Sequence, residues 1–124
     1  MAPAADPHSF IPLSPVEFEV LLVLSAGDSH GWGIIKEAES RWGGDLSFET
    51  GTLYRALRRL TTAGLVHPSD RRPAEGDEDD GRRRYFSITR LGRQVAAVEA
   101  RRLEAQVAAA RERALLAGSP GGGS

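Results

Sequence analysis

The segment Gly51 to Leu60 limits the fold of this chain more than any other part of the sequence. At the helical period of about 100° per residue, Leu53, Leu57 and Leu60 fall on one stripe. The roughly opposite stripe carries Thr52, Arg55, Arg59 and Thr62. The pattern predicts a helix over about residues 50–63 that packs one face into a core and offers the other to anions.

Two strands joined by a basic loop are expected after this helix. Gly64 is the residue type that commonly ends a helix, and Leu65 and Val66 form a short apolar run. After an irregular stretch, three arginines at 82–84 lead into an alternating segment at 85–88. The order helix, strand, basic loop, strand is that of a winged helix.

Two shorter helices are predicted before residue 50. Ser14, Pro15 and Glu17 form a capping box with proline at the first helical position. Residues 30 to about 42 carry apolar side chains at helical spacing and end at two glycines. We expect this second segment to be the helix that supports the arginine-rich one.

The last predicted helix, about residues 90–117, has more apolar surface than so small a body can cover. Thr89 is its expected N-cap, and its apolar residues form two stripes separated by a skip of five positions. Because monomers avoid large exposed apolar patches, we expect a second copy of the helix to cover this surface in a two-fold dimer. The predicted dimerisation residues are Leu91, Val95, Val98, Leu103, Val107 and Ala110.

Composition argues against several other functions. The length of 124 residues favours one domain, and the lack of cysteine excludes disulfides, cysteine-rich zinc sites and a thiol nucleophile. The three histidines lack metal-ligand spacing, and no phosphate loop or nucleophile elbow is present. We therefore predict no catalysis, cofactor or metal. Neither a signal peptide nor a membrane span is recognisable, which predicts a cytoplasmic protein.

The charge is unevenly distributed along the chain. The formal net charge is −1, but five acids form one run, so the rest of the chain carries +4. A basic surplus of this kind favours phosphate binding. The run itself is either a solvated loop tip or an autoinhibitory segment that competes with phosphate for arginines. Its members are Glu75, Asp77, Glu78, Asp79 and Asp80.

At four places the sequence resembles the PadR-like family of transcriptional regulators, over about residues 13–115. The matching segments are His30-Gly31-Trp32-Gly33-Ile34, Gly51-Thr52-Leu53-Tyr54 with Leu57, Arg59 and Leu60, Gly64-Leu65-Val66, and residues 82–89 with Leu91 and Gly92. The family usually has tyrosine where Trp32 stands. The resemblance implies a DNA-binding winged helix-turn-helix, a dimer, and small, flat, apolar effectors bound near the dimer interface.

Within that frame, the arginines are interpreted as DNA contacts, because their planar fork can make two hydrogen bonds to guanine or phosphate. The candidate DNA-binding residues are Thr52, Tyr54, Arg55, Arg58 and Arg59 on the helix and Arg82, Arg83 and Arg84 in the wing. The alternatives are a solvated helix face and a wing patch that balances the neighbouring acids. Tyr54 lies at the border of the core, where packing is its other role.

The two tryptophans have two interpretations. Trp32 and Trp42 are candidates for an aromatic effector pocket, and the alternative is that both pack in the core. His30 belongs to the His-Gly signature of the family, where we interpret it as structural.

The sequence thus predicts a mainly α fold with a small β-wing. Residues 1–12 are expected to be a flexible arm, although Phe10 and Ile11 can also dock on the body. Residues 13–89 form the winged helix-turn-helix with its wing at about 65–89, residues 90–117 the dimerisation helix, and 118–124 a flexible tail. The predicted function is a sequence-specific repressor relieved by an effector. A winged helix that binds proteins, and an enzyme, are the two alternatives.

Overall fold

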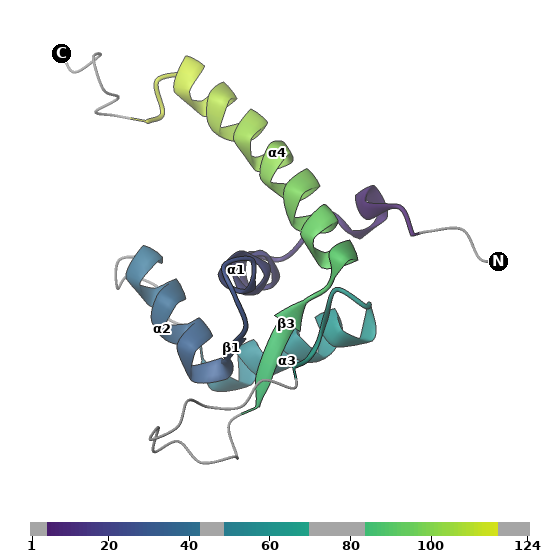
Figure 1. Ribbon diagram of the computed structural model, residues 1–124. Coiled ribbons are helices and arrows are strands. Elements are labelled where there is room, and N and C mark those ends of the chain that lie inside the picture. Colours follow the sequence, from purple (N-terminus) through teal and green to yellow (C-terminus); the bar gives the residue numbers. More distant parts are fainter. Residues whose placement is uncertain (1–4, 43–48, 70–83, 117–124) are drawn as a thin grey trace.

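The computed structural model describes residues 5–42, 49–69 and 84–116. A 3₁₀ helix, η1 (Pro7–Phe10), precedes α1 (Pro15–Leu24), β1 (Ser29–His30) and α2 (Gly31–Trp42). The chain continues with α3 (Thr50–Thr62), β2 (Val66–Pro68), β3 (Tyr85–Ile88) and α4 (Arg90–Glu112). In Figure 1, α1 is seen end-on at the centre, α2 and α3 lie on one side of it, and α4 projects away from the body. This mainly helical winged architecture confirms the predicted fold class.

The three strands form one antiparallel sheet in the order β1-β3-β2. In β3, Phe86 pairs with Ser29 of β1 and with Pro68 of β2, so the central strand holds both neighbours at the same residue. Phe86 is buried while its neighbours in β3 are half-buried. Phe86 therefore anchors the sheet to the helices, together with the buried Val66 of β2 and with Ile88.

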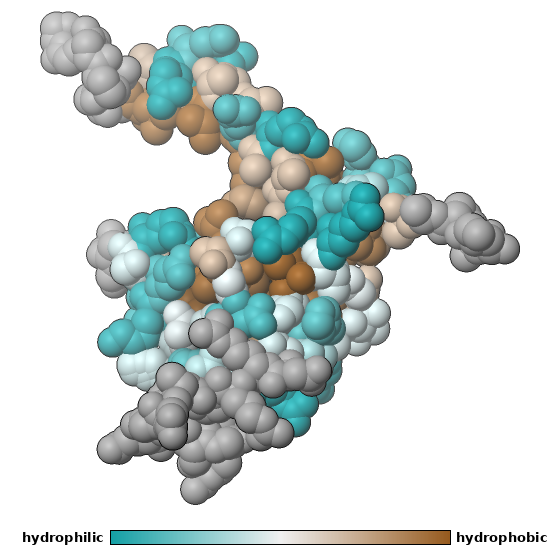
Figure 2. Space-filling model, viewed as in Figure 1, coloured by the Kyte–Doolittle hydropathy of each residue, from teal (hydrophilic) through white to brown (hydrophobic). Residues whose placement is uncertain are grey.

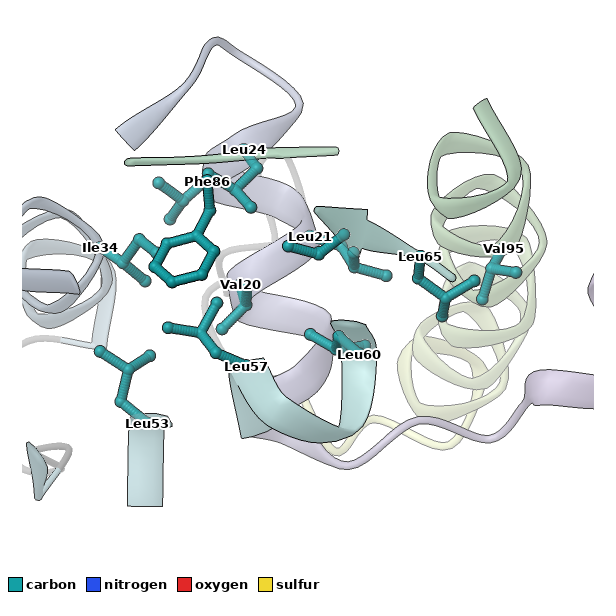
Figure 3. Close-up of a cluster of buried hydrophobic side chains, with 12 residues drawn as sticks. Val20, Leu21, Leu24, Ile34, Leu53, Leu57, Leu60, Leu65, Phe86 and Val95 are labelled. Atoms are coloured by element: carbon teal, nitrogen blue, oxygen red, sulfur yellow. The ribbon is translucent and has the colours of Figure 1, made fainter. Parts of the chain in front are cut away.

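A single apolar cluster joins α1, α2, α3, the sheet and the start of α4. Figure 3 shows the ring of Phe86 pointing into the space between Ile34, Val20 and Leu57, while Leu65 and Val95 meet on the α4 side. Leu53, Leu57 and Leu60 are all buried in the cluster, as the stripe in the sequence predicts. Burial of this apolar surface is the main force that holds α3 against the body.

Local sequence signals set the helix boundaries as expected. The Ser14 hydroxyl accepts from the Glu17 N–H at 3.1 Å and the Glu17 carboxylate accepts from the Ser14 N–H at 2.9 Å, which completes the capping box. Gly64 has φ +83°, and the N–H of Leu65 reaches the Leu60 carbonyl at 2.9 Å. This is the Schellman motif that ends α3, and it requires a left-handed residue at position 64.

The start of α4 lies unusually close to the end of α3. The Thr89 hydroxyl accepts from the Gly92 N–H at 2.9 Å and donates to the Gly64 carbonyl at 2.7 Å. A Cβ at position 92 would overlap the Leu65 carbonyl oxygen and lie 2.8 Å from Cγ1 of Ile88. Glycine at 92 therefore permits α4 to cross the sheet at backbone contact distance.

The structure corrects the predicted division of α4. Val95 is fully buried and Val98 is buried as well, because this end of the helix packs on α1 and the rest of the core. These two residues are therefore unavailable to a second copy, and Leu91 is half-buried against the same core. Leu103 and Ala110 remain partly exposed and Val107 is exposed. The helix ends at Glu112, short of the predicted residue 117.

The N-terminal segment also differs from the predicted arm. Residues 7–10 form η1, which packs against α4, and Phe10, Ile11 and Leu13 lie against the apolar core. The carboxylate of Glu99 in α4 accepts from the Leu13 N–H at 2.7 Å. The docked alternative for Phe10 and Ile11 is thus confirmed, because apolar side chains and a buried carboxylate hold the segment. The wing tip at 70–83 and the predicted tail at 118–124 lie outside the described residues.

Candidate nucleic-acid interface

The exposed face of α3 carries its basic residues. Arg55 and Arg58 are exposed and lie on the side of the helix away from its buried leucines. Arg55 bends toward the start of the helix, where its Nη2 is 3.3 Å from Oγ1 of Thr52. A Cβ at position 51 would stand 3.2 Å from Nη1 of Arg55, so Gly51 leaves room for this guanidinium. The centre of the face is therefore cationic and accessible.

Arg59 differs from the other two arginines of α3. Its Nε donates to Oε2 of Glu17 in α1 at 2.8 Å. Burial raises the pKa of Glu17, but the hydrogen bonds from Arg59 and Ser14 outweigh burial and lower the pKa below its ordinary value. The structure thus turns Arg59 toward α1 instead of the centre of the exposed face.

A groove between α3 and the wing brings the two predicted basic elements together. Its volume is about 380 Å³, and its walls include Arg58 and Thr62 from α3, Pro68 from β2, and Arg84, which directly precedes β3. Arg84 is exposed at the base of the wing. The positions of Arg82 and Arg83 lie outside the described residues. Among the predicted wing arginines, Arg84 is the one that the structure places beside α3.

Tyr54 stands at the border between this groove and the supporting helix. It is half-exposed, and a Cβ at Gly31 would overlap its hydroxyl oxygen. Gly31 therefore allows the ring to lie against the first turn of α2. Tyr54 packs α3 onto α2 and also keeps an exposed edge, so both of its predicted roles fit the geometry.

Trp32 lines a second hollow, of about 480 Å³, between α2 and the start of α3. The indole is 44% exposed and so is not a core residue. Nζ of Lys36, one helical turn later, lies 4.6 Å from the ring centroid in a cation–π contact. Ile35, Glu39, Thr50 and Tyr54 complete the walls. The side chain of Trp42 lies outside the described residues.

His30 positions α2 and with it Trp32. Its Nδ1 accepts from the Gly33 N–H at 3.1 Å, so the ring caps the helix. The ring meets Tyr85 of β3 edge-on, with 5.1 Å between centroids. These contacts agree with the structural interpretation of His30. Glu19 of α1, almost fully buried, pairs with Arg41 at the other end of α2, and its hydrogen bond raises the pKa of Arg41.

Sequence reasoning missed two residues of this surface. Lys36 is recognisable only from its four-residue spacing after Trp32, which places the two on one helix face. Glu17 was assigned only to the capping box, because its partner Arg59 lies 42 positions away. In the parts of the chain that the structure describes, no cluster of three or more potential metal ligands occurs. No described helix is long and apolar enough to cross a membrane.

Comparison with known proteins gives a consistent family. The description "Transcriptional regulator PadR-like family" matches residues 20–98. A transcriptional regulator from Clostridium thermocellum superposes with a TM-score of 0.64 at 23% identity, covering 82% of this chain and 97% of that one. A PadR family transcription regulator from Clostridium difficile gives 0.64 at 19% identity, with 80% and 97% covered.

A third solved structure contains nucleic acid. Bacillus subtilis PadR in complex with operator DNA superposes with a TM-score of 0.55 at 21% identity, covering 69% of this chain and 46% of that one. At this identity the likeness concerns the fold. No curated protein sequence matched the chain.

Proposed function

Because the chain belongs to the PadR-like family of transcriptional regulators, we propose that it is a sequence-specific repressor that binds operator DNA as a homodimer. The observation that carries the proposal is the shared groove of Arg58 and Arg84, which joins the basic face of α3 to the base of the wing. A helix and an adjacent wing with arginines on one side fit the major groove and the neighbouring backbone of a duplex.

Each candidate residue has a proposed role. Arg55 and Arg58, at the centre of the exposed face, contact base edges, since a guanidinium can bond guanine in two places. Thr52 and Tyr54 contact the backbone on either side. Arg84, with Arg82 and Arg83 of the wing, contacts phosphates. The likeness in fold to Bacillus subtilis PadR, whose structure is a complex with operator DNA, supports DNA as the partner.

The dimer is proposed to form through the projecting half of α4. Figure 2 shows hydrophobic surface along one flank of this helix and onto the body. Leu103, Val107 and Ala110 lie on the projecting half, and Leu115 and Leu116 are exposed beyond it. A second copy would remove this surface from water. In such a dimer the two α3 helices reach half-sites about one helical turn apart, roughly 34–36 Å.

An effector site is proposed at Trp32. The hollow beside it has an aromatic wall, an aliphatic wall and a lysine, which suits a small, flat, largely apolar molecule. It adjoins Tyr54 and the first residue of α3, so a bound molecule would alter the approach of α3 to DNA. Relief of repression would follow from that change. We place the protein in the cytoplasm, where its DNA target is.

Selection of bound sequences from a random DNA pool tests the proposal. We expect enrichment of an inverted repeat and an affinity that falls steeply with salt. Arg55→Ala is expected to cost about 1–3 kcal/mol of binding free energy and to relax the preference at one position of each half-site. Thr62→Ala is the matched control on the same face. No retention of any duplex at low salt would instead favour a protein-binding winged helix.

A further inference from the structure

Glu17 and Arg59 join the N-terminus of α1 to the exposed flank of α3. Oε2 of Glu17 accepts from Nε of Arg59 at 2.8 Å, while Oε1 accepts from the Ser14 N–H at 2.9 Å. Both oxygens of the carboxylate are therefore used, one for the cap and one for the arginine. The contact fixes an arginine of α3 to a helix that is 42 positions earlier in the chain.

The two partners differ in burial. The Glu17 side chain is 16% exposed, whereas that of Arg59 is 54% exposed. Burial raises the pKa of the Glu17 carboxyl, but the hydrogen bonds from Arg59 and Ser14 lower it below its ordinary value, which favours the ionised form. A charged group with little contact with water needs its counter-charge more than an exposed one does. Because the nearly buried Glu17 needs its counter-charge, the pair restricts the movement of the Arg59 side chain, which would otherwise be free to turn in solvent.

The other two arginines of α3 have no such restraint among the described residues. Arg55 contacts the uncharged hydroxyl of Thr52, and Arg58 makes no ion pair with any described residue. Arg59, by contrast, has given its Nε to Glu17, which excludes the fork that combines Nε with one Nη. A phosphate that approached its remaining nitrogens would also approach the negative charge of Glu17.

We propose that Glu17 withholds Arg59 from DNA, so that Glu17 limits non-specific affinity and, of the three arginines of α3, only Arg55 and Arg58 contact the duplex. The inference rests on the proposed DNA-binding function. Non-specific binding depends almost entirely on cations that replace counterions at phosphates, and a neutral ion pair replaces none. Glu17 is thus a specificity-determining residue that acts through Arg59.

The test uses the full chain and a 24-base-pair duplex of random sequence, titrated at several salt concentrations. Glu17→Gln keeps the capping box, because glutamine also serves at that position, but removes the charge that holds Arg59. We expect this variant to bind on the order of five- to tenfold more tightly at 0.1 M salt. Its salt dependence should steepen by about 0.9 in the slope of log K against log salt, as one more phosphate is neutralised.

Two further variants isolate the cause. Glu37→Gln changes the net charge equally, and its partner Arg41 keeps Glu19, so it should leave the slope unchanged. The double variant of Glu17→Gln with Arg59→Gln removes a neutral pair, so it should bind as the wild type does and show none of the gain. Thermal unfolding of each variant verifies that it is folded.

The outcomes separate this inference from the proposed function. If Glu17→Gln gains no more than Glu37→Gln, or if the double variant binds more weakly than the wild type with a flatter slope, Glu17 does not withhold Arg59 from DNA and the inference is wrong. Absence of binding by every variant down to low salt would overturn the inference together with the DNA-binding function.

Discussion

The helices α3 and α4 have the same kind of sequence, with leucines or valines on one side and arginines on the other. They differ in how much of the apolar side is buried. The buried face of α3 is covered along its length by Leu53, Ala56, Leu57 and Leu60. In α4 the first half is covered and the second is not, since Val95 is 0% exposed and Val107 is 45% exposed. Amphipathic pattern alone therefore does not tell which apolar stripe the chain itself will bury.

The difference follows from the size of the body. The cluster formed by α1, α2, α3 and the sheet meets α4 only over its first turns, near the close approach at Gly92. After Glu99 no residue of α4 is buried, and the residues of the helix from 103 to 112 are exposed or half-buried. Among the described residues the apolar surface of the second half of α4 is left exposed, which is the observation that the proposed dimer explains.

The largest expected effect comes from placing glutamate in the covered half of α4 or in its projecting half. Val95→Glu would bury a carboxylate without a partner and should cost more than about 4 kcal/mol of the free energy of unfolding. Val107→Glu combined with Leu103→Glu should leave each chain folded but abolish self-association. Urea unfolding and sedimentation equilibrium measure the two results. A wild-type protein that is monomeric at micromolar concentration would contradict the proposed dimer.

Substitutions on the two faces of α3 should also have different effects, one on stability and the other on DNA binding. Leu57→Ala removes a buried side chain and should cost about 2–5 kcal/mol of unfolding free energy. Its neighbour Arg58→Ala should change that free energy by less than about 0.5 kcal/mol while weakening operator binding by about 1–3 kcal/mol. Urea titration and fluorescence anisotropy give the two values. A strongly destabilised Arg58→Ala would mean that the exposed face has a structural role.

Glu99 makes the covered half of α4 sensitive to acid. Its side chain is 1% exposed, and hydrogen bonds from Arg102 and from the Leu13 N–H lower its pKa despite burial. Because the folded pKa lies below the ordinary value of 4.5, its stabilisation is present above that pH and is lost as pH falls through the folded pKa. Glu99→Gln should cost about 1–3 kcal/mol at pH 7.

The variant Glu99→Gln also tests whether the effect of acid on stability arises from Glu99. The difference in unfolding free energy between wild type and Glu99→Gln should shrink below about pH 4.5, the ordinary value. Thermal unfolding from pH 7 down to pH 3 measures it. A difference that stays constant with pH would assign the cost to packing instead of charge.

The smallest expected effect concerns the junction between the two helices. Thr89→Ala removes the hydrogen bonds to the Gly92 N–H and the Gly64 carbonyl and should cost about 0.5–2 kcal/mol. Thr89→Ser retains the hydroxyl and should recover most of the loss. Both values come from urea titration. Equal destabilisation by serine and alanine would show that the methyl group, and not the cap, stabilises the junction.

Much of the fold was predictable because its signals are local. The capping box at Ser14 and Glu17, the helix stop at Gly64 and the cap at Thr89 each depend on residues within a few positions, and all three are confirmed. The strand β1 was not predicted. Two residues carry no periodicity, and Ser29 and His30 form a strand only because β3 pairs with them.

The candidate site was predictable in composition but not in arrangement. The exposed positions of Arg55 and Arg58 follow from the helical period, and Arg84 was expected near them as part of the wing. The capture of Arg59 by Glu17 was not expected, because a helical wheel shows only one helix and not the neighbour beside it. The roles of these residues in DNA binding remain predictions for the experiments above.

The sequence by itself determined the four α-helices, the caps at the starts of α1 and α4, the end of α3 and the basic face of α3, since period and caps depend on neighbouring residues. Only the tertiary structure decided that Val95 is buried and Val107 is not, and that Arg59 pairs with Glu17. These outcomes depend on contacts between distant segments, and the body is large enough to cover only one end of α4. Two valines of one helix, Val95 and Val107, thus differ in burial because of what packs opposite them.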